Sequence, residues 1–216
     1  MIDDLNMTAK IMVVSLIIFS TALHEMAHAF TATWLGDPTP GRCGRLTLNP
    51  IPHLQPAFTA IILPLLMFLS GRGLMILAQT PINPTRFRRP LRDQALVAVA
   101  GPLTNLAFGA VSLILLWILW TPEQKNLAAI VLEEVIVWSV ILAIFNMMPI
   151  PPLDGYRIIR AFLPFSLRRP LDDFASGGAG IIVVFVLGGA LVQVVAAPVI
   201  SFIVWNLFPR LASGEF

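Results

Sequence analysis

The chain has 216 residues, of which 57% are apolar and 12% are charged, and its mean hydropathy is +0.83. Soluble globular domains are typically about 25% charged, so half that fraction cannot cover a globule with water-compatible side chains. These values exclude an ordinary cytosolic enzyme, a disordered protein and a disulfide-stapled secreted module. They predict an integral membrane protein. The net charge of +2 gives no reason to expect nucleic acid as a partner.

Four apolar stretches are long enough to form membrane-spanning helices, because crossing about 30 Å of hydrocarbon takes roughly 20 residues. They run over residues 9–35, 95–120, 127–148 and 178–207. The connectors between them are rich in proline, which ends helices. The sequence therefore predicts helices separated by short, irregular links.

Residues 57–78 are also apolar but less regular, with Pro64 inside the segment and Gly71 and Gly73 near its end. Proline and glycine both disfavour a helix interior, so we expect a broken or re-entrant segment here. The overall expectation is an all-α polytopic membrane protein with about four to six transmembrane helices. A single membrane-embedded domain is expected to cover residues 1–216.

Three ionisable side chains lie close together within the first apolar stretch, where residues 24–28 read His-Glu-Met-Ala-His. The four-residue spacing puts His24 and His28 on one helical face, about 5–6 Å apart at Cβ, which suits two ligands of one zinc ion. Glu25 then lies close enough to accept a proton from a metal-bound water. Such a short pattern can arise by chance, but each charge inside a membrane helix costs about 2.5–3.5 kcal/mol, and zinc binding would offset that cost.

A catalytic zinc site takes three protein ligands and leaves one position for water. The candidates for the third ligand are Asp37, His53, Glu133, Glu134 and Asp154. Asp154 is favoured because it follows a proline-rich break at the end of the third stretch, and non-helical backbone at membrane depth survives only inside protein or beside a wet cavity. The alternative is that Asp154 caps a short helix over residues 156–162.

With the His-Glu-x-x-His pattern at residues 24–28 and with Asp154, the chain resembles the site-2 protease family of intramembrane zinc metalloproteases, in a compact form without PDZ or CBS domains. Members carry H-E-x-x-H in one transmembrane helix and N-x-x-P-x-x-x-L-D-G downstream, and residues 146–155 match the second motif. Residues 100–105 and 48–53 are also similar to family elements, although the acidic residue expected at Gln55 is missing.

The resemblance implies a Zn²⁺ ion bound by His24, His28 and Asp154, with Glu25 as the catalytic acid and base. It also implies that Asn105 and Asn146 help to hold the substrate backbone or the developing oxyanion. Hydrogen bonds between helices are the alternative role for both asparagines. His53 is either an accessory site residue or a loop histidine that meets lipid headgroups.

The expected activity is hydrolysis of a peptide bond within or near a transmembrane segment of a membrane-protein substrate, in the lipid bilayer of a prokaryotic cell. A zinc or other divalent-metal transporter is the alternative from another class, since some of these also carry histidine–glutamate motifs. Transporters usually show internal inverted repeats, and none is evident in the sequence. The oligomeric state is left open.

The expected metal site also predicts a topology. His24 and His28 lie toward the end of the first stretch, and Asp154 lies just beyond the third, so one ion can join them only if both stretches run in the same direction. Arginines group beside these ends, and basic loops are usually cytoplasmic. We therefore expect the site near the cytoplasmic side, the N-terminus outside, and 57–78 to begin and end inside.

Overall fold

The computed structural model describes residues 6–54, 62, 78–119, 127–176, 179–203 and 206, and these residues contain helices and no strand. The predicted all-α class is therefore confirmed. The predicted break at 57–78 lies outside the described residues, apart from residues 62 and 78.

Three of the described helices are long and apolar enough to cross a membrane: α1 (Met7–Trp34), α5 (Pro90–Leu119) and α6 (Leu127–Asn146). The shortest has 20 residues, which at 1.5 Å per residue spans the hydrocarbon core. The fourth predicted stretch corresponds to α9 (Ala179–Phe202). The three spans found by length and composition are fewer than the four to six expected, but they are compatible with the same polytopic fold.

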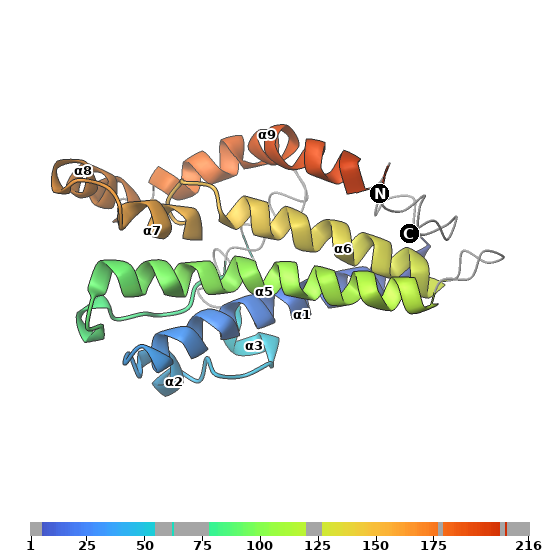
Figure 1. Ribbon diagram of the computed structural model, residues 1–216, viewed down its shortest axis with the longest axis horizontal. Helices are drawn as coiled ribbons and strands as arrows, with labels where there is room; N and C mark the ends of the chain where they lie inside the picture. The colour runs from blue at the N-terminus through green and yellow to red at the C-terminus, as the bar shows by residue number, and fades with distance from the viewer. Residues whose placement is uncertain are drawn as a thin grey trace.

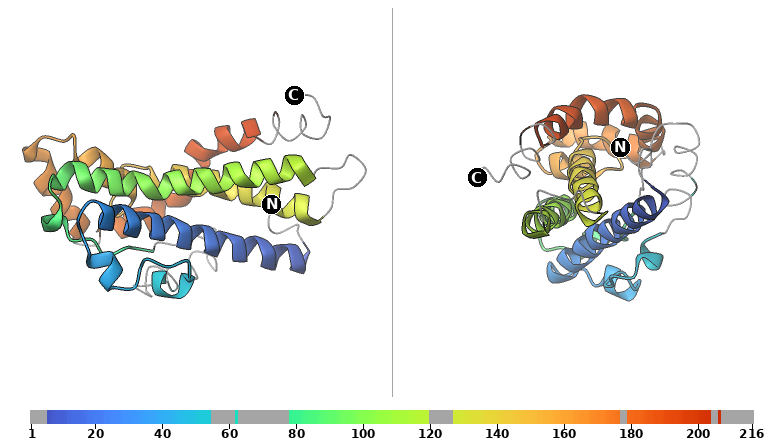
Figure 2. Two further views of the ribbon diagram at one scale, coloured as in Figure 1. Left: turned by 60° about the horizontal axis from the view of Figure 1, so that its bottom comes forward. Right: turned by 90° about the vertical axis from the view of Figure 1, so that its right-hand side faces the viewer.

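The long helices form a bundle in which α1, α5 and α6 contact one another and α9 packs on α6 (Figures 1 and 2). Helices α1 and α6 run in the same direction and α5 runs the opposite way, as a metal site shared between the ends of the first and third stretches requires. Apolar side chains from α1 and α6 form one buried cluster: Ala9, Val13, Ile17, Val131, Val135 and Leu142.

Small residues allow α5 and α6 to approach closely. A Cβ placed at Gly109 of α5 would lie only 3.0 Å from the Cβ of Ser139 on α6. Close backbone contact of this kind drives helix association in lipid, where the hydrophobic effect between helices is absent. The outward face of α5, by contrast, carries exposed apolar side chains such as Leu103, Ile114 and Trp117, as a lipid-facing surface requires.

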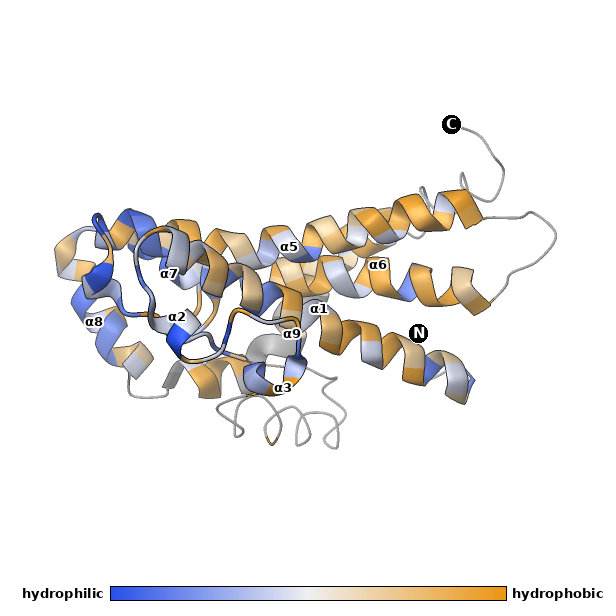
Figure 3. Cartoon of the chain, turned by 90° about the horizontal axis from the view of Figure 1, so that it is seen from below, coloured by the Kyte–Doolittle hydropathy of each residue, from blue (hydrophilic) through white to orange (hydrophobic). Residues whose placement is uncertain are grey.

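Most of the short helices lie toward one end of the bundle; the helix over residues 50–53 packs beside α1, nearer the middle (Figure 1). Helices α2 (Thr39–Arg42) and α3 (Pro50–His53) follow α1, the 3-10 helix η3 (Pro84–Arg86) precedes α5, and α7 (Asp154–Arg160) and α8 (Phe165–Ser176) follow α6. The hydrophilic residues of α7, α8 and the beginning of α5 lie at the same end (Figure 3). These segments carry several of the arginines that group along the sequence, at residues 86–92, 157–160 and 168–169.

Asp37 connects two loops at this end of the molecule. The backbone turns after α1 at Gly36, whose φ of 105° favours glycine, and the Asp37 side chain is fully buried. Its carboxylate accepts hydrogen bonds from the backbone N–H groups of Thr39, at 3.0 Å, and Asn83, at 2.6 Å. Asp37 thus joins the loop after α1 to the loop before α5 and is occupied away from the candidate metal ligands.

Candidate active site

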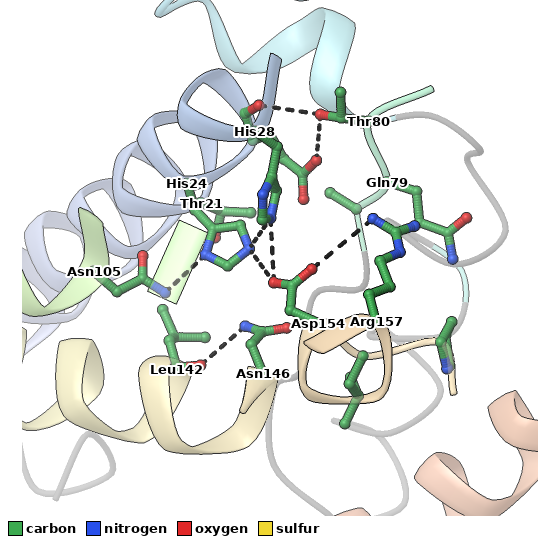
Figure 4. A pocket seen from close by; sticks show the side chains of 14 residues that line it. Thr21, His24, His28, Gln79, Thr80, Asn105, Leu142, Asn146, Asp154 and Arg157 are labelled. Atoms are coloured by element: carbon green, nitrogen blue, oxygen red, sulfur yellow. Dashed lines mark hydrogen bonds and ion pairs between the residues drawn. The ribbon is translucent and has the colours of Figure 1, made fainter. Parts of the chain in front are cut away.

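The three predicted metal ligands meet in one buried place between α1 and α7 (Figure 4). The Nε2 atoms of His24 and His28 lie 2.9 Å apart, and Oδ2 of Asp154 lies 3.2 Å from each of them. None of the three residues is more than 6% exposed. Asp154 is the first residue of α7 and Leu153 is its N-cap, so the alternative role of Asp154 as the cap of this helix is wrong.

The other nitrogen of each imidazole is anchored by α5. Nδ1 of His28 lies 2.7 Å from the backbone carbonyl of Val97, which can only accept, so this nitrogen carries the proton and the lone pair of a neutral ring sits on Nε2. Nδ1 of His24 lies 3.1 Å from the side-chain amide of Asn105, which also contacts Ser20 at 3.3 Å. Both Nε2 atoms are therefore oriented toward Asp154.

The donor set fits a metal ion. Two imidazole nitrogens and a carboxylate oxygen converge, and the buried Oδ2 of Asp154 has no hydrogen-bond partner among the described residues. Tetrahedral ligands about 2.0 Å from zinc lie roughly 3.3 Å from one another, close to the 2.9 and 3.2 Å separations found here. One ligand atom each from His24, Glu25 and His28 also lies within 4.8 Å of the others.

Glu25 is held by a contact that the sequence did not reveal. The hydroxyl of Thr80 lies 2.6 Å from Oε2 of Glu25 and 3.1 Å from its backbone carbonyl, and both residues are buried. Thr80 precedes a proline in the connector before α5 and belongs to no motif, so only the tertiary structure shows its place. A hydroxyl donor on one carboxylate oxygen fixes the carboxylate and leaves the other oxygen available.

Two glycines make room for this arrangement. A Cβ at Gly101 of α5 would lie 2.5 Å from Nε2 of His28 and 2.5 Å from Cε1 of His24, so any side chain there would displace the imidazoles. A Cβ at Gly155 would overlap the backbone carbonyl of Met147. Glycine at these positions lets α5 approach the histidines and lets α7 fold back against the end of α6.

The candidate ligands border a cavity of about 30 Å³, which is large enough for a water-sized group. Its lining comes from α1, α5, α6, α7 and residues 78–80. The amide of Asn146 lines this cavity and donates within its own helix to the carbonyl of Leu142, at 2.9 Å. Asn105 lines it as well but is only 1% exposed, because His24 and Ser20 cover its amide.

The remaining candidates lie elsewhere. His53 is buried on α3, where its Nε2 lies 2.9 Å from the carbonyl of Thr47, and it does not line the cavity. Its burial also excludes direct contact with lipid headgroups. Glu133 and Glu134 lie near the beginning of α6, at the opposite end of that helix from Asp154.

Comparison with known proteins adds independent information. The model of peptidase family M50 matches residues 123–191. YwhC of Bacillus subtilis, named as a candidate zinc metalloprotease, is 35% identical over 210 residues, which cover 94% of this chain and 87% of that protein. Rip2 of Mycolicibacterium smegmatis, named in the same way, is 30% identical over 193 residues, covering 84% of this chain and 68% of that protein. No solved structure matches the chain.

Proposed function

Since the chain belongs to peptidase family M50, the family of the site-2 proteases, and is a metalloprotease, we propose that it uses zinc to hydrolyse a peptide bond within or near a transmembrane segment of a membrane-protein substrate. The observation that carries this proposal is the convergence of two imidazole nitrogens and one carboxylate oxygen inside a bundle of membrane-spanning helices. Ionisable groups at such a place are costly unless they serve a function.

His24, His28 and Asp154 are the proposed ligands. A hydrogen-bond partner of the ring nitrogen that does not bind the metal fixes the orientation and the tautomer of a ligating histidine. The Val97 carbonyl is such a partner for His28. The side-chain amide of Asn105 lies 3.1 Å from Nδ1 of His24, so we assign Asn105 to positioning His24.

Glu25 is the proposed acid and base. When bound, zinc supplies Lewis acidity and lowers the pKa of a coordinated water to about 7. The carboxylate of Glu25 takes a proton from the attacking water as its oxygen bonds to the scissile carbonyl carbon. As the C–N bond breaks, Glu25 gives that proton to the leaving amine. Thr80 holds the carboxylate in place through the 2.6 Å hydrogen bond.

The substrate must be unwound before it can react, because a helix hides its carbonyl groups in hydrogen bonds. Residues 78–80 are not helical and line the cavity, so their backbone can pair with an extended stretch of substrate. The amide of Asn146 has two N–H donors, of which one serves Leu142. The second is available for the substrate carbonyl as negative charge develops on its oxygen.

We also propose the orientation expected from the sequence, with the site near the cytoplasmic side and the N-terminus outside. The support is the charge at the end of the bundle that carries the site, where α7, α8 and the residues before α5 contribute most of the arginines. Basic residues beside spanning helices face the cytoplasm. Cysteines introduced at residues 38–52 should react only with reagent added from the cytoplasmic side.

The direct test is Glu25→Gln, which keeps the size of the side chain and removes its basicity. Purified in detergent, this variant should bind as much zinc as the wild type and fail to cleave a model transmembrane substrate. Asp173→Asn, on the exposed face of α8, is the matched control and should cleave normally. Undiminished cleavage by Glu25→Gln would refute the assignment, and zinc uptake into proteoliposomes without cleavage would favour the transporter alternative.

A further inference from the structure

A second cavity adjoins the active site. It has a volume of about 420 Å³, within the range of pockets that bind small molecules or side chains. Its walls come from the turn before α7, from α7 itself, and from α5, α8 and α9. It shares Gln79, Pro152 and Arg157 with the cavity around the candidate metal ligands. A peptide lying across the catalytic residues can therefore place a neighbouring side chain in it.

Most of the charge in this second cavity is already compensated. Arg160 of α7 donates two hydrogen bonds, both of 2.7 Å, to the carboxylate of Asp172 on α8. The hydroxyl of Tyr156 donates to the same carboxylate at 2.6 Å. The hydrogen bonds from Arg160 hold the pKa of Asp172 below its ordinary value. Asp172 thus offers little attraction for a further cation.

Arg157 differs from Arg160. Arg157 lines both cavities, and its side chain is 29% exposed; Figure 4 shows its guanidinium beside Asp154. Among the described residues, its guanidinium pairs with Oδ1 of Asp154, at 4.0 Å, a separation too long for a hydrogen bond. Asp154 also faces both candidate imidazole ligands. The guanidinium therefore retains hydrogen-bonding capacity toward the cavity, with the amides of Gln79 and Gln94 as further polar groups.

We propose that this cavity is a substrate subsite in which Arg157 binds an acidic side chain close to the scissile bond. The planar guanidinium matches a carboxylate in two parallel hydrogen bonds. The cavity lies at the arginine-rich end of the bundle, which further favours an anionic group. This inference rests on the proposed proteolytic function and adds a preference for the residue that the enzyme accepts beside the cleaved bond.

The test measures binding without turnover. In the Glu25→Gln background, dissociation constants are measured for extended peptides that carry Glu, Gln or Lys at each position flanking the scissile bond. At one position the Glu peptide should bind about tenfold more tightly than the Gln peptide, a difference of about 1.4 kcal/mol, because hydrogen bonds between two charged groups are stronger than those to a neutral amide. Adding Arg157→Gln should remove this difference, and Arg157→Glu should reverse it in favour of Lys.

Arg169→Glu, on the exposed surface of α8, controls for the change in net charge and should leave the preference intact. A Glu preference that persists in Arg157→Gln would overturn the proposal. So would loss of bound zinc in both Arg157 variants, because Arg157 would then be a positioning residue for Asp154. Normal cleavage by the wild type with no preference at any position would refute the subsite and leave the proposed function standing. Absence of cleavage altogether would refute the proposed function.

Discussion

Replacing Thr80 with valine removes one hydroxyl from the active site and little else, because the two side chains have nearly the same shape. The hydroxyl lies 2.6 Å from Oε2 of Glu25, and both residues are buried. A hydrogen bond to a charged group contributes about 1.5–3 kcal/mol. If it holds the carboxylate in its reactive position, its loss lowers kcat about 10- to 150-fold. KM should change little, because the substitution removes only the hydroxyl that contacts Glu25 and keeps the backbone of residues 78–80, which is proposed to pair with the substrate.

The assay is steady-state cleavage of a labelled transmembrane peptide in detergent, with bound zinc measured on the same samples. Thr21→Val is the matched control, since Thr21 lines the same cavity but donates to the carbonyl of Ile17 on its own helix, at 3.0 Å. Thr80→Ser, which keeps the hydroxyl, should recover most of the activity. A kcat for Thr80→Val within twofold of the wild type would refute the reasoning, as would an equal loss in Thr21→Val.

Three further variants test the surroundings of the site. Gly101→Ala places a Cβ 2.5 Å from imidazole atoms of His24 and His28. It should weaken zinc binding at least about tenfold, as measured by competition with a chelator. Unchanged zinc affinity would mean that α5 can shift. Asn105→Ala should weaken zinc binding about 10- to 100-fold, and an effect on KM alone would assign this residue to the substrate instead. Asp172→Asn should lower the stability of the α7–α8 contact by no more than about 1 kcal/mol, because the ion pair is partly exposed. The pKa of Asp172 is lowered in the folded protein. The stability that its ion pair contributes is therefore complete above about pH 4 and is lost as the pH falls further. Thermal unfolding of the wild type and the variant at several pH values would measure this loss.

Most of what the sequence predicted about the site depends on local geometry; the exception is Asp154, which was predicted from the proline-rich break before it and from the motif at residues 146–155. His24 and His28 fall on one face because an α-helix repeats every 3.6 residues, whatever surrounds it. The spans were predictable because bilayer thickness sets the length of an apolar helix. The observed helix ends differ from the predicted ends by a few residues: α5 begins at Pro90 and α6 ends at Asn146.

Other parts depend on which helices meet, and the sequence carried no signal for them. Thr80 looks like an ordinary connector residue until the chain brings it beside Glu25, 55 positions earlier. Val97 acts through its backbone carbonyl, which every residue possesses. Asn105 was noticed, but its contact with His24 arises from the packing of α5 on α1. A pattern of residue types cannot encode such contacts.

The most direct test of the account is the zinc content of the purified protein, together with the ligand set seen by X-ray absorption at the zinc edge. The wild type and Glu25→Gln should each hold one zinc per chain, with two imidazole nitrogens and one carboxylate oxygen among the ligands. His24→Ala and Asp154→Ala should both lose the ion while remaining folded. Full zinc occupancy in folded Asp154→Ala would contradict a metal centre shared between α1 and α7, and the proposed mechanism and orientation would lose their basis.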